Sequence, residues 1–287
     1  MLVGGIEAGG TKFVCAVANE QLEMIEKISF PTVSPEETLK QVFAFFDQYH
    51  VAAIGIGSFG PIGVRPDQPK YGYVLSTPKK GWENFDVLGT LKSRYSIPMY
   101  WTTDVNTAAY GELKMGAAQG CSSCIYVTVG TGIGGGIIVD RQIFQGISHP
   151  EMGHFFVKRH PEDTYKGCCP YHQDCLEGLA SGPSLEARTG IKGEQLTADD
   201  PIWELQAYYL AQALVAYTVI VGPEKIVLGG GVMNQDHLLQ KIRRHFLKAI
   251  NGYVQVPSVE EYIVRWELPN ESGLIGALLL AMELTNQ

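Results

Sequence analysis

Two glycine-rich turns, one in each half of the chain, restrict the fold more than any other feature. The segments EAGGTK (7–12) and GTGIGGG (130–136) each join two short apolar stretches, which predicts a strand–turn–strand unit in each half. The expected strands are 2–7, 12–18, 125–129 and 136–140. Neither turn opens a helix as a Walker A loop or a Rossmann fingerprint does. Their consecutive backbone N–H groups, with the hydroxyls of Thr11 and Thr131, can nevertheless bind an anion.

The pattern of apolar and polar residues in the rest of the chain predicts further helices and strands, which make the two halves similar α/β units. Ser34, Pro35 and Glu37 carry the signature of a helix start, and an apolar stripe at helical spacing follows them. A third glycine turn, LGGGVMN (228–234), leads into another helix. Further strands are expected at 51–57, 98–101 and 225–228, and further helices from 104, at 203–221 and at 272–284. We therefore predict a duplicated α/β protein with domains 1–118 and 119–287. The last helix of the chain can pack back on the first domain.

The composition excludes several classes of protein. The net charge of −8, with no cluster of basic residues, argues against a nucleic-acid partner. No uncharged apolar run reaches the length of a membrane span, and the start MLVGGIEAGG lacks the basic region of a signal peptide. We therefore expect a cytoplasmic protein with reduced thiols and no membrane partner, in which a structural disulfide is disfavoured.

Asp104 lies where a predicted strand ends and a helix begins, in TTDVNTAA (102–109). A helix N-cap alone would explain an aspartate at this position. Ligands of open α/β sheets, however, bind at the carboxyl ends of the strands. In a two-lobed nucleotide-binding protein, which the paired glycine turns favour, Asp104 is the natural general base for a substrate hydroxyl.

Three of the six cysteines and one histidine fall within GCCPYHQDC (167–175). Buried thiols and a redox pair at Cys168–Cys169 are the alternatives to a metal site, but a vicinal disulfide is strained and rare. Cys169, His172 and Cys175, with His154 upstream, supply four nitrogen and sulfur ligands, which suit a tetrahedral structural zinc ion. Of the two adjacent cysteines we favour Cys169. The CSSC segment (121–124) lacks a second ligand pair, and its cysteines are interpreted as ordinary thiols.

The motifs EAGGTK, TDVNTAA, GTGIGGG, Glu151-x-Gly153-His154, the Cys/His segment and LGGGV occur in this order over nearly the whole chain. They resemble the ROK family of sugar kinases, and within it the bacterial fructokinases. The resemblance implies two actin-like (ribonuclease H-like) α/β domains with a cleft between them. It also implies transfer of the γ-phosphoryl group of ATP to a hexose, expected to be the 6-hydroxyl of D-fructose. ATP, Mg²⁺ and Zn²⁺ are the implied cofactors, and the small-molecule sugar and a second copy in a homodimer are the implied partners.

The resemblance assigns roles to individual residues. Asp104 becomes the catalytic base, and zinc is held by His154, Cys169, His172 and Cys175. The implied sugar contacts are Gly60, Pro61, Thr103, Asp104, Glu151, His154 and Glu177. The implied ATP contacts are Gly9, Gly10, Thr11, Lys12, Thr131, Gly132, Gly134, Pro183, Gly229, Gly230, Gly231, Val232 and Met233.

Three positions depart from the pattern of the family. Glu7 stands where the family usually has the aspartate that helps to hold magnesium, and the longer side chain can act through water. Thr103 stands where glucose-specific members have asparagine, which fits a change toward fructose. Pro170 occupies the middle position of the commoner three-cysteine zinc pattern, and His172 replaces the missing thiolate.

Two other functions compete with a fructokinase. One is a kinase for glucose, mannose or an N-acetylhexosamine, against which Thr103 and the His-containing zinc segment weigh. The other is a sugar-binding transcriptional repressor. Repressors of the family carry an N-terminal helix-turn-helix domain, and the first glycine turn of this chain leaves no room for one.

Overall fold

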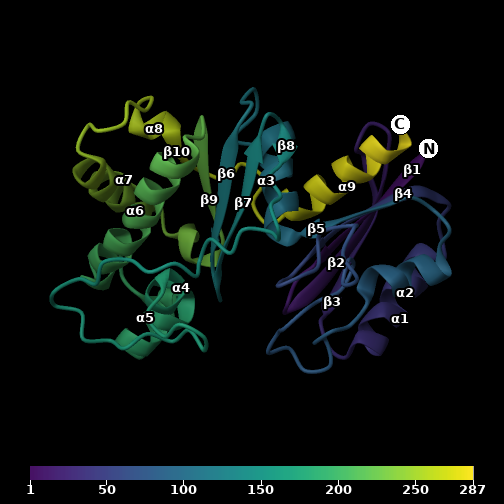
Figure 1. The fold of residues 1–287 in the computed structure, drawn as a ribbon, viewed down its shortest axis with the longest axis horizontal. Coiled ribbons are helices and arrows are strands. Elements are labelled where there is room, and N and C mark those ends of the chain that lie inside the picture. Colours follow the sequence, from purple (N-terminus) through teal and green to yellow (C-terminus); the bar gives the residue numbers. More distant parts are fainter. Residues whose placement is uncertain (287) are drawn as a thin grey trace. The chain divides into compact units, whose positions relative to one another are not determined.

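The computed structural model describes residues 1–286 and divides into two compact units (Figure 1). Unit 1 consists of Met1–Met115, Ile143–Pro150 and the C-terminal segment from Asn270. Unit 2 consists of Gly116–Gln142 and Glu151–Pro269. The last helix thus groups with unit 1, and so does a short internal segment that the sequence alone did not single out.

Unit 1 contains a five-stranded sheet in the order β3-β2-β1-β4-β5 (Figure 1). The first three strands are antiparallel neighbours, and β4 and β5 continue the sheet in parallel with β1. The elements of this unit are β1 (Leu2–Ala8), β2 (Lys12–Asn19), β3 (Met24–Pro31), α1 (Pro35–Phe46), β4 (Val51–Ser58), α2 (Val87–Arg94), β5 (Met99–Thr103), α3 (Asp104–Met115) and α9 (Ser272–Thr285).

Strands β1, β2, β4 and β5 of the unit 1 sheet are largely buried on both faces, whereas the edge strand β3 is mostly exposed. Alternate residues of β2 point to opposite sides, so that Phe13 packs with the residues of α1 and α2, while Val14 packs with α9. The start of α1 is the one expected, because the Ser34 side chain accepts a hydrogen bond from the N–H of Glu37. On the other face α9 crosses α3 closely, since a Cβ at Gly276 would collide with the backbone of Thr107.

Unit 2 repeats the strand order, with β8-β7-β6-β9-β10 in place of β3-β2-β1-β4-β5. Strands β6 and β7 are antiparallel, and β9 and β10 extend the sheet in parallel with β6. The elements are β6 (Cys124–Val129), β7 (Ile133–Val139), β8 (Gln142–Ile143), α4 (Leu176–Ala180), α5 (Gly182–Thr189), η1 (Gly193–Gln195), α6 (Ile202–Val221), β9 (Lys225–Gly229), η2 (Gly231–Asn234), α7 (Asp236–Ile250), α8 (Val259–Tyr262) and β10 (Ile263–Arg265). No helix within residues 1–286 is both long and apolar enough to cross a membrane.

The second glycine turn is shorter than the sequence suggested. The prediction that a strand begins at Gly136 was wrong, because β7 begins at Ile133 and its three glycines pair with β6. Close packing explains glycine within this strand, since a Cβ at Gly135 would lie 2.5 Å from the sulfur of Met152. Only residues 130–132 remain as the turn, and Gly134 belongs to the strand opposite Thr128.

Candidate active site and metal centre

Three strands of unit 1 end at the same level of the sheet. Ala8 of β1 pairs with Ser58 of β4, and Ser58 pairs with Thr103 of β5. The first glycine turn, the loop that begins at Phe59 and the start of α3 therefore leave the sheet at one edge. Strand order and register thus place the first glycine turn, the loop after β4 and the start of α3 at one edge of the sheet. This is the edge at which α/β proteins bind ligands.

Thr103, and not Asp104, caps helix α3. The Thr103 hydroxyl oxygen accepts a hydrogen bond from the N–H of Asn106, at 3.2 Å, and the side chain is buried. Asp104 is the first helical residue, and its Oδ1 accepts the N–H of Val105 at 2.9 Å. Because the capping position is already filled, capping does not account for the aspartate. Its half-buried carboxylate lies at the edge of the sheet described above.

Glu7 lies on β1 immediately before the first glycine turn, and its side chain is half-buried. A Cβ at Gly273 would lie 2.8 Å from Glu7 Oε1, so the carboxylate packs against the first turn of α9. Burial raises the pKa of Glu7, and the positive charges of Lys12 and Lys27 partly offset this effect. In the adjoining turn, Gly10, Thr11 and Lys12 are exposed.

In unit 2, three segments meet around Gly130. The Gly130 carbonyl accepts the N–H of Gly182 at 2.7 Å, and a Cβ at Gly130 would lie 3.9 Å from the nitrogen of Gly231. The second glycine turn, the start of α5 with its exposed Pro183, and the third glycine turn thus form one surface. Of the expected ATP contacts here, Met233 is fully buried in the core.

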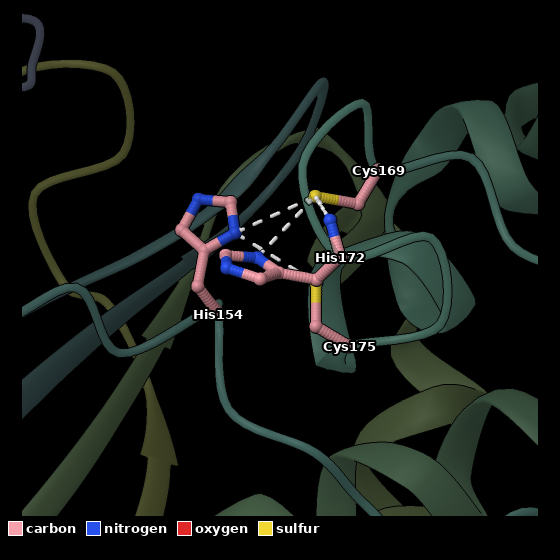
Figure 2. A group of neighbouring side chains, drawn as sticks. All are labelled: His154, Cys169, His172 and Cys175. Carbon is pink, nitrogen blue, oxygen red and sulfur yellow. Dashed lines mark hydrogen bonds between the residues drawn. The ribbon is translucent and has the colours of Figure 1, made fainter.

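Four side chains from the Cys/His segment and its upstream histidine converge in unit 2. All the ligand atoms of His154, Cys169, His172 and Cys175 lie within 4.8 Å of one another. Figure 2 shows the four side chains turned toward one another, with the Nδ1 atom of His154 3.7 Å from both sulfurs. The Nδ1 atom of His172 lies 3.8 Å from the sulfur of Cys169.

The spacing of these atoms fits zinc. A tetrahedral zinc ion, with sulfur at about 2.3 Å and nitrogen at about 2.0 Å, separates its sulfur and nitrogen ligands by about 3.5 Å. The observed separations of 3.7–3.8 Å need only a small contraction. The adjacent Cys168 is exposed, and its sulfur instead lies 3.5 Å from the carbonyl oxygen of Gly178. Cys121 and Cys124 lie outside this group and form no disulfide.

The chain that carries these ligands has a second, metal-independent anchor. Asp163 forms an ion pair with Arg188 of α5 at 2.8 Å, and the two side chains are 3% and 8% exposed. The hydroxyl of Tyr209 also donates to Asp163, at 2.6 Å. The sequence analysis missed this network, because its members lie far apart in the chain and no motif marks them.

Glu177 connects the metal ligands to the second glycine turn. Its Oε2 accepts the N–H of Ile133, the first residue of β7, at 2.9 Å. Its Oε1 lies 3.8 Å from Nε2 of His154. Glu151 remains accessible to solvent, but the surrounding protein and the charge of Glu177 raise the pKa of its carboxyl group to about 7. Two acidic groups, a glycine turn and a candidate zinc ligand therefore lie together in unit 2.

A model of the ROK family matches residues 3–284. The chain belongs to the ROK family. The fructokinase of Pediococcus pentosaceus is 53% identical to it over 281 residues, which cover 98% of each chain. A ROK hexokinase from Thermus thermophilus superposes with a TM-score of 0.83 at 26% identity over the full length of both chains. A ROK family glucokinase from Streptomyces griseus, solved with glucose and AMPPNP, has a TM-score of 0.77 at 25% identity and covers 99% of this chain and 100% of its own. The expected fold, with two actin-like α/β domains, is confirmed by these ROK structures.

Proposed function

We propose that this ROK protein is an ATP-dependent fructokinase that converts D-fructose to fructose 6-phosphate. The observation that carries the proposal is the 53% identity to a fructokinase over 98% of both chains, against 25% to the glucokinase solved with glucose. A helix-starting aspartate that is not needed as a cap supplies the chemistry, because a proton acceptor is required when a hydroxyl group attacks ATP.

Asp104 acts as the general base. Its carboxylate accepts the proton of the fructose 6-hydroxyl as the oxygen forms a bond to the γ-phosphorus and the bond to the leaving ADP oxygen breaks. Most of the rate enhancement in phosphoryl transfer comes from positioning and electrostatics, and a general base adds about 10²- to 10⁴-fold. Thr103 contributes by fixing the start of α3, since its hydroxyl is buried and committed to the helix cap.

The sugar site of the proposal uses both acidic and loop residues. Glu151 and Glu177 accept hydrogen bonds from fructose hydroxyls, and His154 faces the same group. Gly60 and Pro61 line the sugar from the loop after β4 and are both exposed. Accessible carboxylates suit a sugar, because each can accept two or more hydroxyl hydrogen bonds.

ATP is held mainly by backbone groups in this proposal. The phosphates lie on the turns at 9–12 and 130–132, where glycine allows the closest approach of the backbone. Pro183 and residues 229–232 flank the adenosine, and Met233 is left out because its side chain is fully buried. Magnesium, when bound, offsets the charge of the phosphates, and Glu7 is the acid proposed to reach it through water.

Zinc is proposed as a structural ion on His154, Cys169, His172 and Cys175. All four positions of a tetrahedral ion are filled by protein, which distinguishes a structural from a catalytic site. Zinc removal should therefore loosen residues 168–178, measured as loss of amide-exchange protection, while the segment around Asp163 keeps its protection because its ion pair with Arg188 needs no metal. Uniform loss across 155–178 would contradict this division, and a purified protein without stoichiometric zinc would contradict the site itself.

We also propose that the enzyme is a cytoplasmic homodimer. Support for the cytoplasm comes from its six cysteines, which all lie in the described part of the chain and form no disulfide there. Sedimentation of the purified enzyme tests the dimer, and cell fractionation tests the location.

A coupled assay with ATP and a panel of hexoses tests the function. The expected result is the highest kcat/KM for fructose, with phosphate found on the 6-hydroxyl. A higher kcat/KM for glucose, mannose or an N-acetylhexosamine would replace the substrate but keep the reaction. Sugar binding without any ATP consumption would instead support the transcriptional regulator and refute the enzyme.

A further inference from the structure

A short internal segment belongs to unit 1, although in the sequence it lies between the two segments of unit 2. We name Ile143–Pro150 the strap. It begins at Ile143, the last residue of β8 in the second sheet, and ends immediately before Glu151, where unit 2 resumes. The strap has almost no secondary structure and two large exposed apolar side chains, so its packing in unit 1 needs specific contacts.

Those contacts are made with the loop after β4. Nε2 of His149 accepts the N–H of Ile62 at 3.1 Å, and the His149 side chain is only 8% exposed. Nε2 of Gln145 donates to the carbonyl oxygen of Val64 at 2.8 Å. The strap thus pairs with the loop at two backbone positions, directly beyond Gly60 and Pro61.

The ring of His149 also lies directly beside Gly60. A Cβ at Gly60 would be in ordinary van der Waals contact with the ring, 3.4 Å from a ring carbon of His149 and 3.6 Å from Nε2. On its other side the loop is fixed by the carbonyl of Pro61, which accepts the N–H of Leu75 at 2.8 Å. The conformation of Gly60–Pro61 is therefore held between the imidazole and the segment around Leu75.

The imidazole has the protonation state that this role needs. An Nε2 atom can accept the N–H of Ile62 only when it carries no proton. Burial lowers the pKa of His149, and a hydrogen bond with the backbone of Pro150 offsets only part of that effect. The acceptor is therefore available at neutral pH.

We propose that His149 is a positioning residue for fructose, which acts through the N–H of Ile62 to hold Gly60 and Pro61 in the conformation that receives the sugar. The inference rests on the proposed function, because it takes Gly60 and Pro61 as sugar contacts. Glu151 follows the strap directly. The same eight residues therefore contact the loop of unit 1 and lead into Glu151, a proposed fructose-binding residue of unit 2. His149 is not part of any of the motifs quoted above.

Two substitutions separate this role from ordinary packing. His149→Leu keeps the volume but leaves the N–H of Ile62 buried without an acceptor, whereas His149→Gln offers an amide oxygen near the position of Nε2. We expect His149→Leu to raise the KM for fructose by about 5- to 150-fold, the range expected for an unsatisfied buried donor, with little change in the KM for ATP. His149→Gln should recover most of the loss.

Leu91→Ala serves as the matched control. Leu91 is a buried residue of α2 in the same unit, so its truncation lowers thermal stability without touching the strap. Its KM for fructose should stay at the wild-type value at temperatures well below the melting transition. If His149→Leu does not fold, His149→Asn replaces it, because the shorter side chain cannot reach Ile62.

The outcomes are distinct. Equal increases of both KM values, a loss of stability alone as in Leu91→Ala, or no recovery by His149→Gln would each overturn the role of His149. A wild-type enzyme that does not phosphorylate fructose would overturn the proposed function instead. Active wild type with unchanged His149 variants leaves the function standing and removes only this inference.

Discussion

The contact between Gly132 and Glu177 makes a sharp prediction for Gly132→Ala. A Cβ at Gly132 would lie 2.7 Å from Oε2 and 3.5 Å from Cδ of Glu177. The carboxylate must therefore move, and it is the same oxygen that accepts the N–H of Ile133 at 2.9 Å. One methyl group on the second glycine turn should thus displace Glu177, which we assign to the proposed sugar site.

The size of the effect follows from the hydrogen bond that is lost. A hydrogen bond to a charged group contributes about 1.5–3 kcal/mol, and a factor of ten in affinity corresponds to about 1.4 kcal/mol, so the loss spans about 10- to 150-fold. The side chain of Glu177 is 21% exposed, so water can replace part of the bond. We therefore expect an increase near the lower end, about tenfold, in the KM for fructose together with an increase in the KM for ATP.

A double-mutant cycle tests the cause. In a Glu177→Ala background the obstacle is absent, so adding Gly132→Ala should cost nothing further, and the two effects should be strongly non-additive. Gly130→Ala is the control within the same turn, because its Cβ would come no closer than 3.9 Å to the nearest atom, the nitrogen of Gly231. Its KM for fructose should remain near the wild-type value. Additive effects in the cycle, or an increase in the KM for ATP alone, would refute the displacement of Glu177.

Three further predictions concern the acids and the thiols. Asp104→Asn should lower kcat by about 10²- to 10⁴-fold, with the calorimetric Kd for fructose nearly unchanged. A kcat above about a tenth of the wild-type value would refute the assignment of Asp104 as general base. Cys169→Ser should lose zinc in elemental analysis and Cys168→Ser should retain it, because only Cys169 joins the four-ligand group; the reverse result would exchange the two assignments. Burial and the charge of Glu177 raise the pKa of Glu151 to about 7, so the KM for fructose should rise as the pH falls through about 7 and the carboxylate is protonated, whereas Glu151→Gln should give a flat profile. A wild-type KM that is constant between about pH 6 and 8 would contradict the role of Glu151.

Local signals in the sequence were sufficient for most of the secondary structure. The cap at Ser34 and the buried strand β4 are confirmed, because capping groups and short apolar runs depend on neighbouring residues. The start of β7 could not be predicted in this way. Glycines normally mark turns, and only the packing of Met152 against Gly135 shows why this one lies in a strand.

The motifs also indicated which residue types form the site, but not how they are used. The sequence favoured Cys169 over Cys168 in the Cys/His group, although both are compatible with the spacing. In the structure the sulfur of Cys169 lies near His154, whereas that of Cys168 lies near the carbonyl oxygen of Gly178. An aspartate before a helix likewise reads as a cap, until the hydroxyl of Thr103 is found in the capping position.

What the sequence determined by itself is the family and the duplicated α/β architecture, together with the candidate groups for the chemistry, because these reside in short contiguous motifs. Only the tertiary structure revealed the links between the motifs. His149 meets Ile62 across 87 residues, and Glu177 meets Ile133 across 44. Contacts of this kind depend on where the chain returns after long excursions, and a hydrogen bond to a backbone N–H leaves no mark on the identity of the residue that donates it.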